Sequence, residues 1–145
     1  LSEDQNVVSD AVRLALAGDA GQRVLVAWHF SWEPALQVAG RSWIPPVLAQ
    51  LLDDPYAAVR CVAERSLKQV APGLLPAGYD YTVSPDSRPS PQASLLERWS
   101  RDMSTARDPT LPAQTLVRLN DTTAMQEGFR RLLRQRDERQ VRLRE

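Results

Sequence analysis

The stretch LAQLLDDPYAAVRCVAERSLKQV, Leu48 to Val70, decides the fold. Its apolar residues recur every three or four positions, which places them on one face of each of two helices. Between these helices, Asp54 offers an N-cap oxygen and Pro55 fits the first position of the second helix. The stretch therefore predicts a helical hairpin. Its second helix is expected to bury Val59, Val62, Ala63, Ser66, Leu67 and Val70.

Two further helices are predicted before this hairpin, whose own first helix is the third of the chain. The first ends near Gly18, and Asp19 is a candidate N-cap for the second, which Pro34 ends. Residues 33–42 are expected to be a short connector, either helical or irregular, and Trp43 opens a third helix that has two prolines in its first turn. The predicted buried stripes are Val8, Ala11, Val12, Ala15 and Leu16; Val24, Ala27, Trp28, Ser31 and Trp32; and Ile44, Val47, Leu48, Leu51 and Leu52.

The four helices form two copies of one unit. A shift of 35 residues aligns Asp19 with Asp54 and Trp28 with Ala63. A fixed period of this length is typical of a helical solenoid. The first copy is less regular, with Leu25 in the place of Arg60.

The second copy, DDPYAAVRCVAERSL, resembles a HEAT repeat. The resemblance rests on Asp54, Pro55, Val59, Arg60, Ala63 and Leu67. It implies an all-α fold in which about two helical hairpins, within residues 1–71, stack into a HEAT-like α-α superhelix.

The remaining chain is expected to extend these repeats. Residues 72–90 form a proline-rich irregular connector, and residues 91–145 a C-terminal helical segment that packs on the repeats. Two very short strands are possible, at 115–119 and 140–144. The two expected C-terminal helices carry the stripes Leu95, Trp99, Met103 and Ala106, and Met125, Phe129, Leu132 and Leu133, with Asp121 as the cap of the second.

A wider resemblance follows from the order of AWHFSW, SWIPPVLAQLLDDPYAAVR, GYDY and RLLRQRDERQVRLRE along the chain. This order is similar to the C-terminal repeat region of bacterial multihaem cytochrome c-like proteins. The resemblance implies an exported protein whose haem is held upstream; without it, the cytoplasm is the expected compartment. The chain departs from the haem-binding pattern, since Cys61 is followed by Val62, Ala63 and Glu64 and no CxxCH occurs. No cofactor is therefore expected within this chain, which starts at Leu1 and is expected to be part of a longer protein.

Composition narrows the classes of partner. The 18 basic and 18 acidic residues cancel, which argues against a general affinity for polyanions or acidic membranes. There is no run of about 18 apolar residues, so membrane insertion is not expected. The single cysteine allows no internal disulfide and no cysteine pair for a metal.

The candidate site residues have structural interpretations that we favour. His29 is the only histidine, and we expect a structural or surface role over contact with the haem of a partner, for which Val26 and Phe30 would be available. Cys61 lies about 200° around its helix from Val59, and inert burial is favoured over redox chemistry. The four tryptophans, Trp28, Trp32, Trp43 and Trp99, are expected to pack in the core and not to form a ligand platform.

An arginine-rich end is the strongest local charge signal. Residues 128–144 carry seven arginines against Asp137 and Glu138, a net charge of +5. A solvated face, or contact with acidic groups such as Asp53, Asp54 or Asp80, is favoured over nucleic-acid binding. The candidate interaction residues are Arg130, Arg131, Arg134, Arg142 and Arg144.

No motif for catalysis is present. A phosphate-binding loop, GxSxG and HExxH are all missing from the sequence, and capping accounts for the carboxylate pair Asp53–Asp54. We therefore expect a non-catalytic protein-interaction scaffold, whose partner is another protein or an upstream domain. The alternatives are an accessory domain of a multihaem electron-transfer protein and nucleic-acid binding through the arginine-rich end.

Overall fold

The computed structural model of the chain describes residues 9–106 and 122–139. Within these ranges the fold is all-α, with seven α-helices, one 3-10 helix and no strand. The two predicted short strands lie outside the described residues. The elements are α1 (Asp10–Ala17), α2 (Ala20–His29), α3 (Glu33–Ala39), α4 (Ile44–Leu51), α5 (Ala57–Val70), the 3-10 helix η2 (Pro85–Ser87), α6 (Gln92–Ala106) and α7 (Thr122–Arg134).

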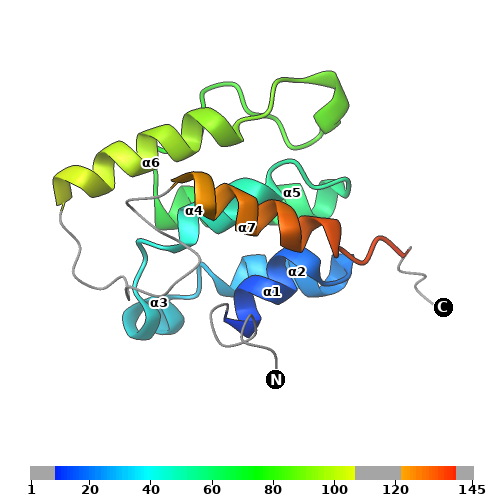
Figure 1. Ribbon diagram of the computed structural model, residues 1–145, viewed down its shortest axis with the longest axis horizontal. Coiled ribbons are helices and arrows are strands. Elements are labelled where there is room, and N and C mark those ends of the chain that lie inside the picture. The colour runs from blue at the N-terminus through cyan, green and yellow to red at the C-terminus, as the bar shows by residue number, and fades with distance from the viewer. Residues whose placement is uncertain (1–8, 107–121, 140–145) are drawn as a thin grey trace.

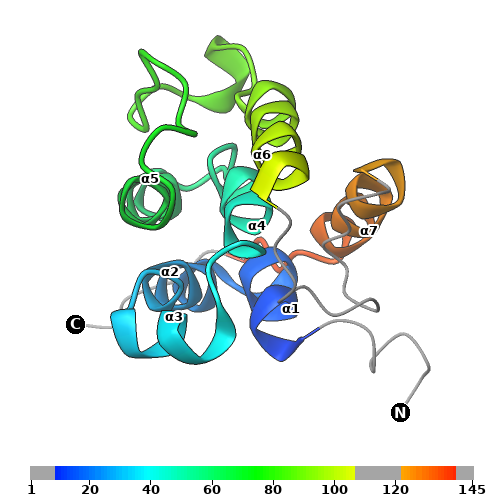
Figure 2. The ribbon, with the colours of Figure 1, turned by 90° about the vertical axis from the view of Figure 1, so that its left-hand side faces the viewer.

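The helices form two hairpins that stack on each other. The first hairpin consists of α1 packed on α2, and the second of α4 packed on α5. Between the two hairpins, α1 contacts α4 and α2 contacts α5 (Figures 1 and 2). The hydroxyl of Ser66 on α5 lies 3.2 Å from the hydroxyl of Ser31, which follows α2. These two residues are 35 positions apart, the same separation as the shift that aligns the two predicted copies.

The C-terminal helices extend one side of this stack. α6 packs on α4 and α7 packs on α1 (Figure 2). Every residue of α4 is buried, because α1, α5 and α6 surround this helix. Pro45 and Pro46 lie in its first turn, as predicted, where a backbone N–H has no partner within the helix. The predicted stripes of α4, α6 and α7 supply buried Ile44, Val47, Leu48, Leu51, Leu52, Leu95, Trp99, Met125, Phe129 and Leu132.

The turn between α1 and α2 follows the sequence closely. Asp19 is the N-cap of α2, and its side chain accepts a hydrogen bond from Gln22 N at 2.8 Å. The Gln22 side chain accepts in turn from Asp19 N at 3.0 Å, which completes a capping box. Gly18 precedes it at a close approach, since a Cβ atom there would lie 2.5 Å from the Leu14 carbonyl oxygen. Glycine is therefore the residue that fits between the two helices.

The start of α5 differs from the prediction. The helix begins at Ala57, with Tyr56 at the N-cap position and no side-chain cap. Asp54 accepts a hydrogen bond from Tyr56 N at 2.9 Å, but its carboxylate is buried and engaged by a distant arginine. Pro55 precedes the helix and does not occupy its first position. The stripe of α5 is as predicted, except that Val62 is only partly buried.

The segment between α5 and α6 is irregular, as the proline content predicted, apart from η2. It is ordered by contacts with the hairpins. Leu74 is buried in the core, and Tyr79 and Tyr81 are partly buried. The hydroxyl of Tyr79 donates to the carbonyl of Leu52 at 2.7 Å, so the segment is fixed to the end of α4.

Candidate interaction surface

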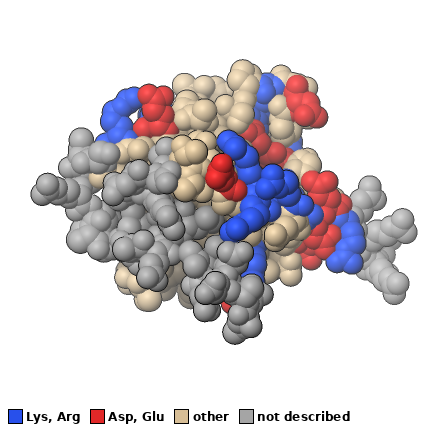
Figure 3. Space-filling model, viewed as in Figure 1, with Lys and Arg blue, Asp and Glu red and all other residues tan. Residues whose placement is uncertain are grey.

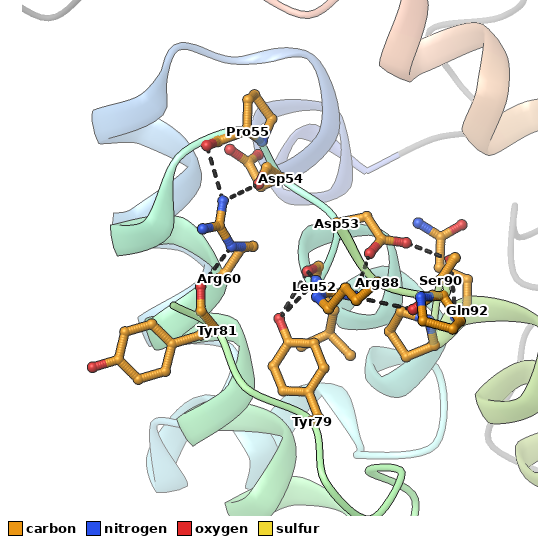
Figure 4. A network of polar contacts seen from close by, with 12 residues as sticks. Leu52, Asp53, Asp54, Pro55, Arg60, Tyr79, Tyr81, Arg88, Ser90 and Gln92 are labelled. Atoms are coloured by element: carbon orange, nitrogen blue, oxygen red, sulfur yellow. Dashed lines mark hydrogen bonds and ion pairs between the residues drawn. The ribbon is translucent and has the colours of Figure 1, made fainter. Parts of the chain in front are cut away.

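A network of polar contacts holds the turn between α4 and α5 (Figure 4). Arg60 is buried, and its Nε donates to the carbonyl of Tyr81 at 2.8 Å. Its Nη1 donates to the carbonyls of Asp54 and Pro55 at 2.7 and 2.9 Å. One side chain therefore closes the turn and ties the irregular segment to it.

Asp53 belongs to the same network. Its Oδ1 lies 2.9 Å from Nη1 of Arg88, and Ser90 donates to its other oxygen. The Arg88 guanidinium lies 4.7 Å from the centroid of the Tyr79 ring and also donates to the Leu52 carbonyl. Burial raises the pKa of Tyr79 to about 12, although Arg88 and Arg60 oppose the shift. At neutral pH the phenol is therefore a protonated donor and no base.

Asp54 has a different role from the one that the sequence suggested. Its carboxylate is fully buried and receives both Nε and Nη2 of Arg23, at 2.8 and 3.2 Å. Arg23 is also fully buried, and its Nη1 donates to the Gly18 carbonyl at 2.6 Å. The interpretation of Asp53–Asp54 as a capping pair is therefore wrong, because both carboxylates form ion pairs with arginines from distant parts of the chain.

The residues that follow α7 contact the ion pair of Arg23 and Asp54. The backbone N–H of Asp137 donates to the Ala17 carbonyl at 3.1 Å, and its carbonyl accepts from Arg23 at 3.2 Å. Arg136 approaches Asp54 to 3.7 Å, and desolvation lowers the pKa of its guanidinium. The Asp137 side chain is bound by Arg139, whose hydrogen bonds lower the pKa of this carboxyl to about 2. The contacts are structural, and they close the hairpin stack at one end.

The repeat signature residues of α5 point inward. Val59, Ala63 and Leu67 have no exposed surface, and Arg60 is 4% exposed. In the first hairpin, Arg23 makes the equivalent contact: Arg23 and Arg60 each donate to the carbonyl five residues earlier. The 35-residue shift aligns Arg60 with Leu25, but Leu25 is 67% exposed and makes no such contact; the residue with the corresponding contact is Arg23.

α2 presents apolar side chains to solvent. Leu25, Trp28 and Trp32 are 67%, 58% and 48% exposed, and we call these three residues the aromatic ridge. Leu25 and Trp28 are separated by one helical turn, and Trp32 follows the turn after α2, where it is the N-cap of α3. The ridge leaves on the order of 300 Å² of apolar surface in water, a size at which surface patches are often functional.

The prediction that all four tryptophans pack in the core is therefore wrong for Trp28 and Trp32. The buried face of α2 is formed by Ala20, Arg23 and Ala27, and lies roughly 150° around the helix from the ridge. Arg23 must face Asp54, and this contact turns Trp28 outward. Trp43 and Trp99 do pack as predicted, and their indole nitrogens donate to the carbonyls of Ala39 and Ser42, respectively.

His29 lies beside the ridge. The side chain is exposed, and its ring centroid lies 5.4 Å from that of Trp32. Phe30 and Val26, which the sequence offered to a partner, are not available: Phe30 is 3% exposed and lies edge-on against Trp43, and Val26 is partly buried. No group of three metal-ligating side chains occurs in the part of the chain that the structure describes.

The other candidates form no further site. Cys61 is partly buried and has a free thiol. Arg130, Arg131 and Arg134 are exposed on α7, whereas Arg142 and Arg144 lie outside the described residues. On the face that carries α7, basic side chains gather beside acidic ones (Figure 3). A groove of about 760 Å³ lies between α6 and the end of α5, but its Arg41 and Arg98 already bind Glu33 and the Gly73 carbonyl.

Comparisons with known proteins give no relative from which a function could be transferred. No protein-family model, curated protein or solved structure matches the chain. Among the described helices, none combines the length and the apolar character that crossing a membrane requires. The aromatic ridge is therefore the candidate that the geometry itself supplies.

Proposed function

We propose that the chain is a non-catalytic protein-interaction scaffold, in which a HEAT-like pair of stacked hairpins presents the aromatic ridge to a protein partner. The observation that carries the proposal is the exposure of Leu25 and Trp28 on α2, whose other face is buried, and of Trp32 just beyond the end of this helix. Tryptophan is enriched among the residues that dominate binding energy at protein interfaces. Large apolar side chains grouped on a surface are a cost in water unless a partner covers them.

The polar clusters support a scaffold and not an enzyme. Asp53, Asp54 and Tyr79 are each engaged by arginines or backbone carbonyls, and the pKa of Tyr79 is raised away from neutrality. A catalytic acid or base needs access to a substrate and a pKa near the working pH. Asp54 instead holds Arg23 of α2, and Asp53 and Tyr79 hold the segment between α5 and α6 to the end of α4.

The test compares the wild-type chain with the double variant Trp28→Ser/Trp32→Ser in affinity capture from cells of the source organism. A protein retained by the wild type is then purified and titrated against both chains. We expect the ridge variant to bind it at least tenfold more weakly, since loss of a central interface tryptophan costs about 2 kcal/mol or more. The matched control is Val38→Ser, which changes an apolar residue that is 90% exposed on α3.

The result is interpreted after both variants are shown to be folded by circular dichroism. A purified partner that binds the wild type and the ridge variant with equal affinity, while Val38→Ser weakens binding, contradicts the proposal.

A further inference from the structure

The outer faces of α2 and α5 form one continuous side of the molecule. The two helices lie next to each other, and Ser31 touches Ser66 between them. In Figure 2, α2 and α5 lie to the left of α1 and α4. On α5, Arg65 and Lys68 are exposed and lie roughly 150° around the helix from the buried stripe, just as the ridge does on α2. The aromatic ridge is therefore flanked by a helix with basic side chains on its outer face.

The exposed formal charges of α2 and α5 are all positive. α2 contains no acidic residue, and its one arginine is buried. The only acidic residue of α5, Glu64, is buried and accepts from Lys68 at 2.5 Å, whereas Lys68 itself stays 60% exposed. Glu33, which follows the ridge, is bound through both carboxylate oxygens by Arg41. Arg65 has no ion pair among the described residues.

The spacing of the ridge selects the shape of its ligand. Leu25 and Trp28 are one turn apart on α2, and Trp32 lies just beyond the end of this helix, so the ridge runs lengthwise along α2. An elongated apolar ridge of this kind fits the apolar stripe of a second helix laid along it. Packed helices lie about 8–10 Å apart. A helix placed on α2 would therefore bring its own flank within reach of the long side chains of α5.

From these observations we infer that the aromatic ridge binds an acidic amphipathic helix of a partner protein, whose apolar stripe covers Leu25, Trp28 and Trp32 and whose carboxylates reach Arg65 and Lys68. The inference rests on the proposed function and adds the chemistry of the partner. A second copy of the chain is a poorer match, because its own α2 and α5 offer no exposed carboxylate.

The test uses two synthetic helical peptides of about 20 residues that share a leucine stripe at the spacing of a helix seam. One carries glutamate at the flanking positions and the other carries lysine. Binding is followed by tryptophan fluorescence, since covering Trp28 and Trp32 should shift their emission to shorter wavelength. At low ionic strength we expect the glutamate peptide to bind at least tenfold more tightly, and this preference to shrink in 0.5 M salt, where the screening length is about 4 Å.

Charge reversal on α5 tests whether Arg65 and Lys68 bind the carboxylates of the glutamate peptide. In Arg65→Glu/Lys68→Glu the preference should invert, so that the lysine peptide binds more tightly. The matched control is Arg13→Glu on α1, an exposed arginine that pairs with Asp10 and lies away from this side; it should leave the preference unchanged.

The outcomes separate the inference from the proposed function. Equal affinity for the two peptides, or a preference for the glutamate peptide that survives charge reversal on α5, contradicts the inference that the partner helix is acidic. Either result is still compatible with the proposed function, since the ridge could bind an uncharged apolar helix. Failure of both peptides overturns the inference, and if sedimentation then shows a dimer that Trp28→Ser abolishes, a second copy is the occupant instead. If a partner's binding does not respond to Trp28→Ser/Trp32→Ser, the proposed function itself fails.

Discussion

Arg23 and Asp54, 31 residues apart, form an ion pair with no exposed surface between the two hairpins. Nε and Nη2 of the guanidinium each contact a different carboxylate oxygen, at 2.8 and 3.2 Å. Such a pair is costly to bury, but removing one partner is more costly still because it leaves an uncompensated charge in the interior. The pair therefore sets the rotation of α2 and depends on both hairpins being folded.

Removal of the arginine should destabilise the protein strongly. We expect Arg23→Leu to lower the free energy of unfolding by about 3–5 kcal/mol, because Asp54 is then left buried without its main cation. Urea denaturation followed by circular dichroism measures the effect. Arg13→Leu, which removes the exposed pair with Asp10, should change stability by less than about 1 kcal/mol. Similar losses in the two variants would contradict the role given to the buried pair.

The capping box at the start of α2 makes a second prediction. Asp19→Ala removes the acceptor for Gln22 N and should cost about 1 kcal/mol. Asp19→Asn should retain most of the stability, since an amide oxygen can accept the same bond. Thermal unfolding compares the two variants, and an equal loss in both would show that charge, and not the hydrogen bond, is responsible.

Tyr79 should give the protein an alkaline transition. Because burial raises its pKa to about 12 in the folded protein, above the ordinary value of 10.0, the neutral phenol is favoured by folding. This contribution to stability is fully present below pH 10 and is lost as the pH rises from 10 to 12. Absorbance at 295 nm should show a phenol that ionises near pH 12 and disappears in Tyr79→Phe. Ionisation of every tyrosine near pH 10 in the folded chain would contradict the burial of this side chain.

Three of the four tryptophans should separate into two classes. Acrylamide should quench the emission of the exposed Trp28 and Trp32, while the buried Trp99 stays protected. In Trp28→Phe/Trp32→Phe we expect a shift of the emission maximum to shorter wavelength and a marked loss of quenching. If this variant were quenched as efficiently as the wild type, the ridge would be covered in the free protein.

Local patterns in the sequence predicted much of the helical structure. The stripe of α4, the prolines of its first turn and the N-cap at Asp19 each involve residues within one or two helical turns. These interactions require no knowledge of the rest of the chain. The irregular character of the segment before α6 follows in the same way from its prolines.

The orientation of α2 was not predictable in this way. The helix has apolar residues on opposite sides, with Ala27 on one and Leu25 and Trp28 on the other. Arginine is mostly exposed in folded proteins, yet Arg23 is buried because Asp54 lies opposite it in the next hairpin. Only this contact between distant residues shows which apolar face is left exposed. The acidic residues of the turn likewise look like caps until their partners, Arg23 and Arg88, are known.

The pair formed by Arg23 and Asp54 also has a consequence for how the protein unfolds. The first hairpin supplies only the cation and the second only the anion, so either hairpin alone would hold an unmatched charge where the other should be. The 35-residue period is therefore a unit of sequence but not a unit of cooperativity. We expect the two hairpins to melt in one transition, and a chain cut within residues 33–42 to remain functional only while its halves stay associated.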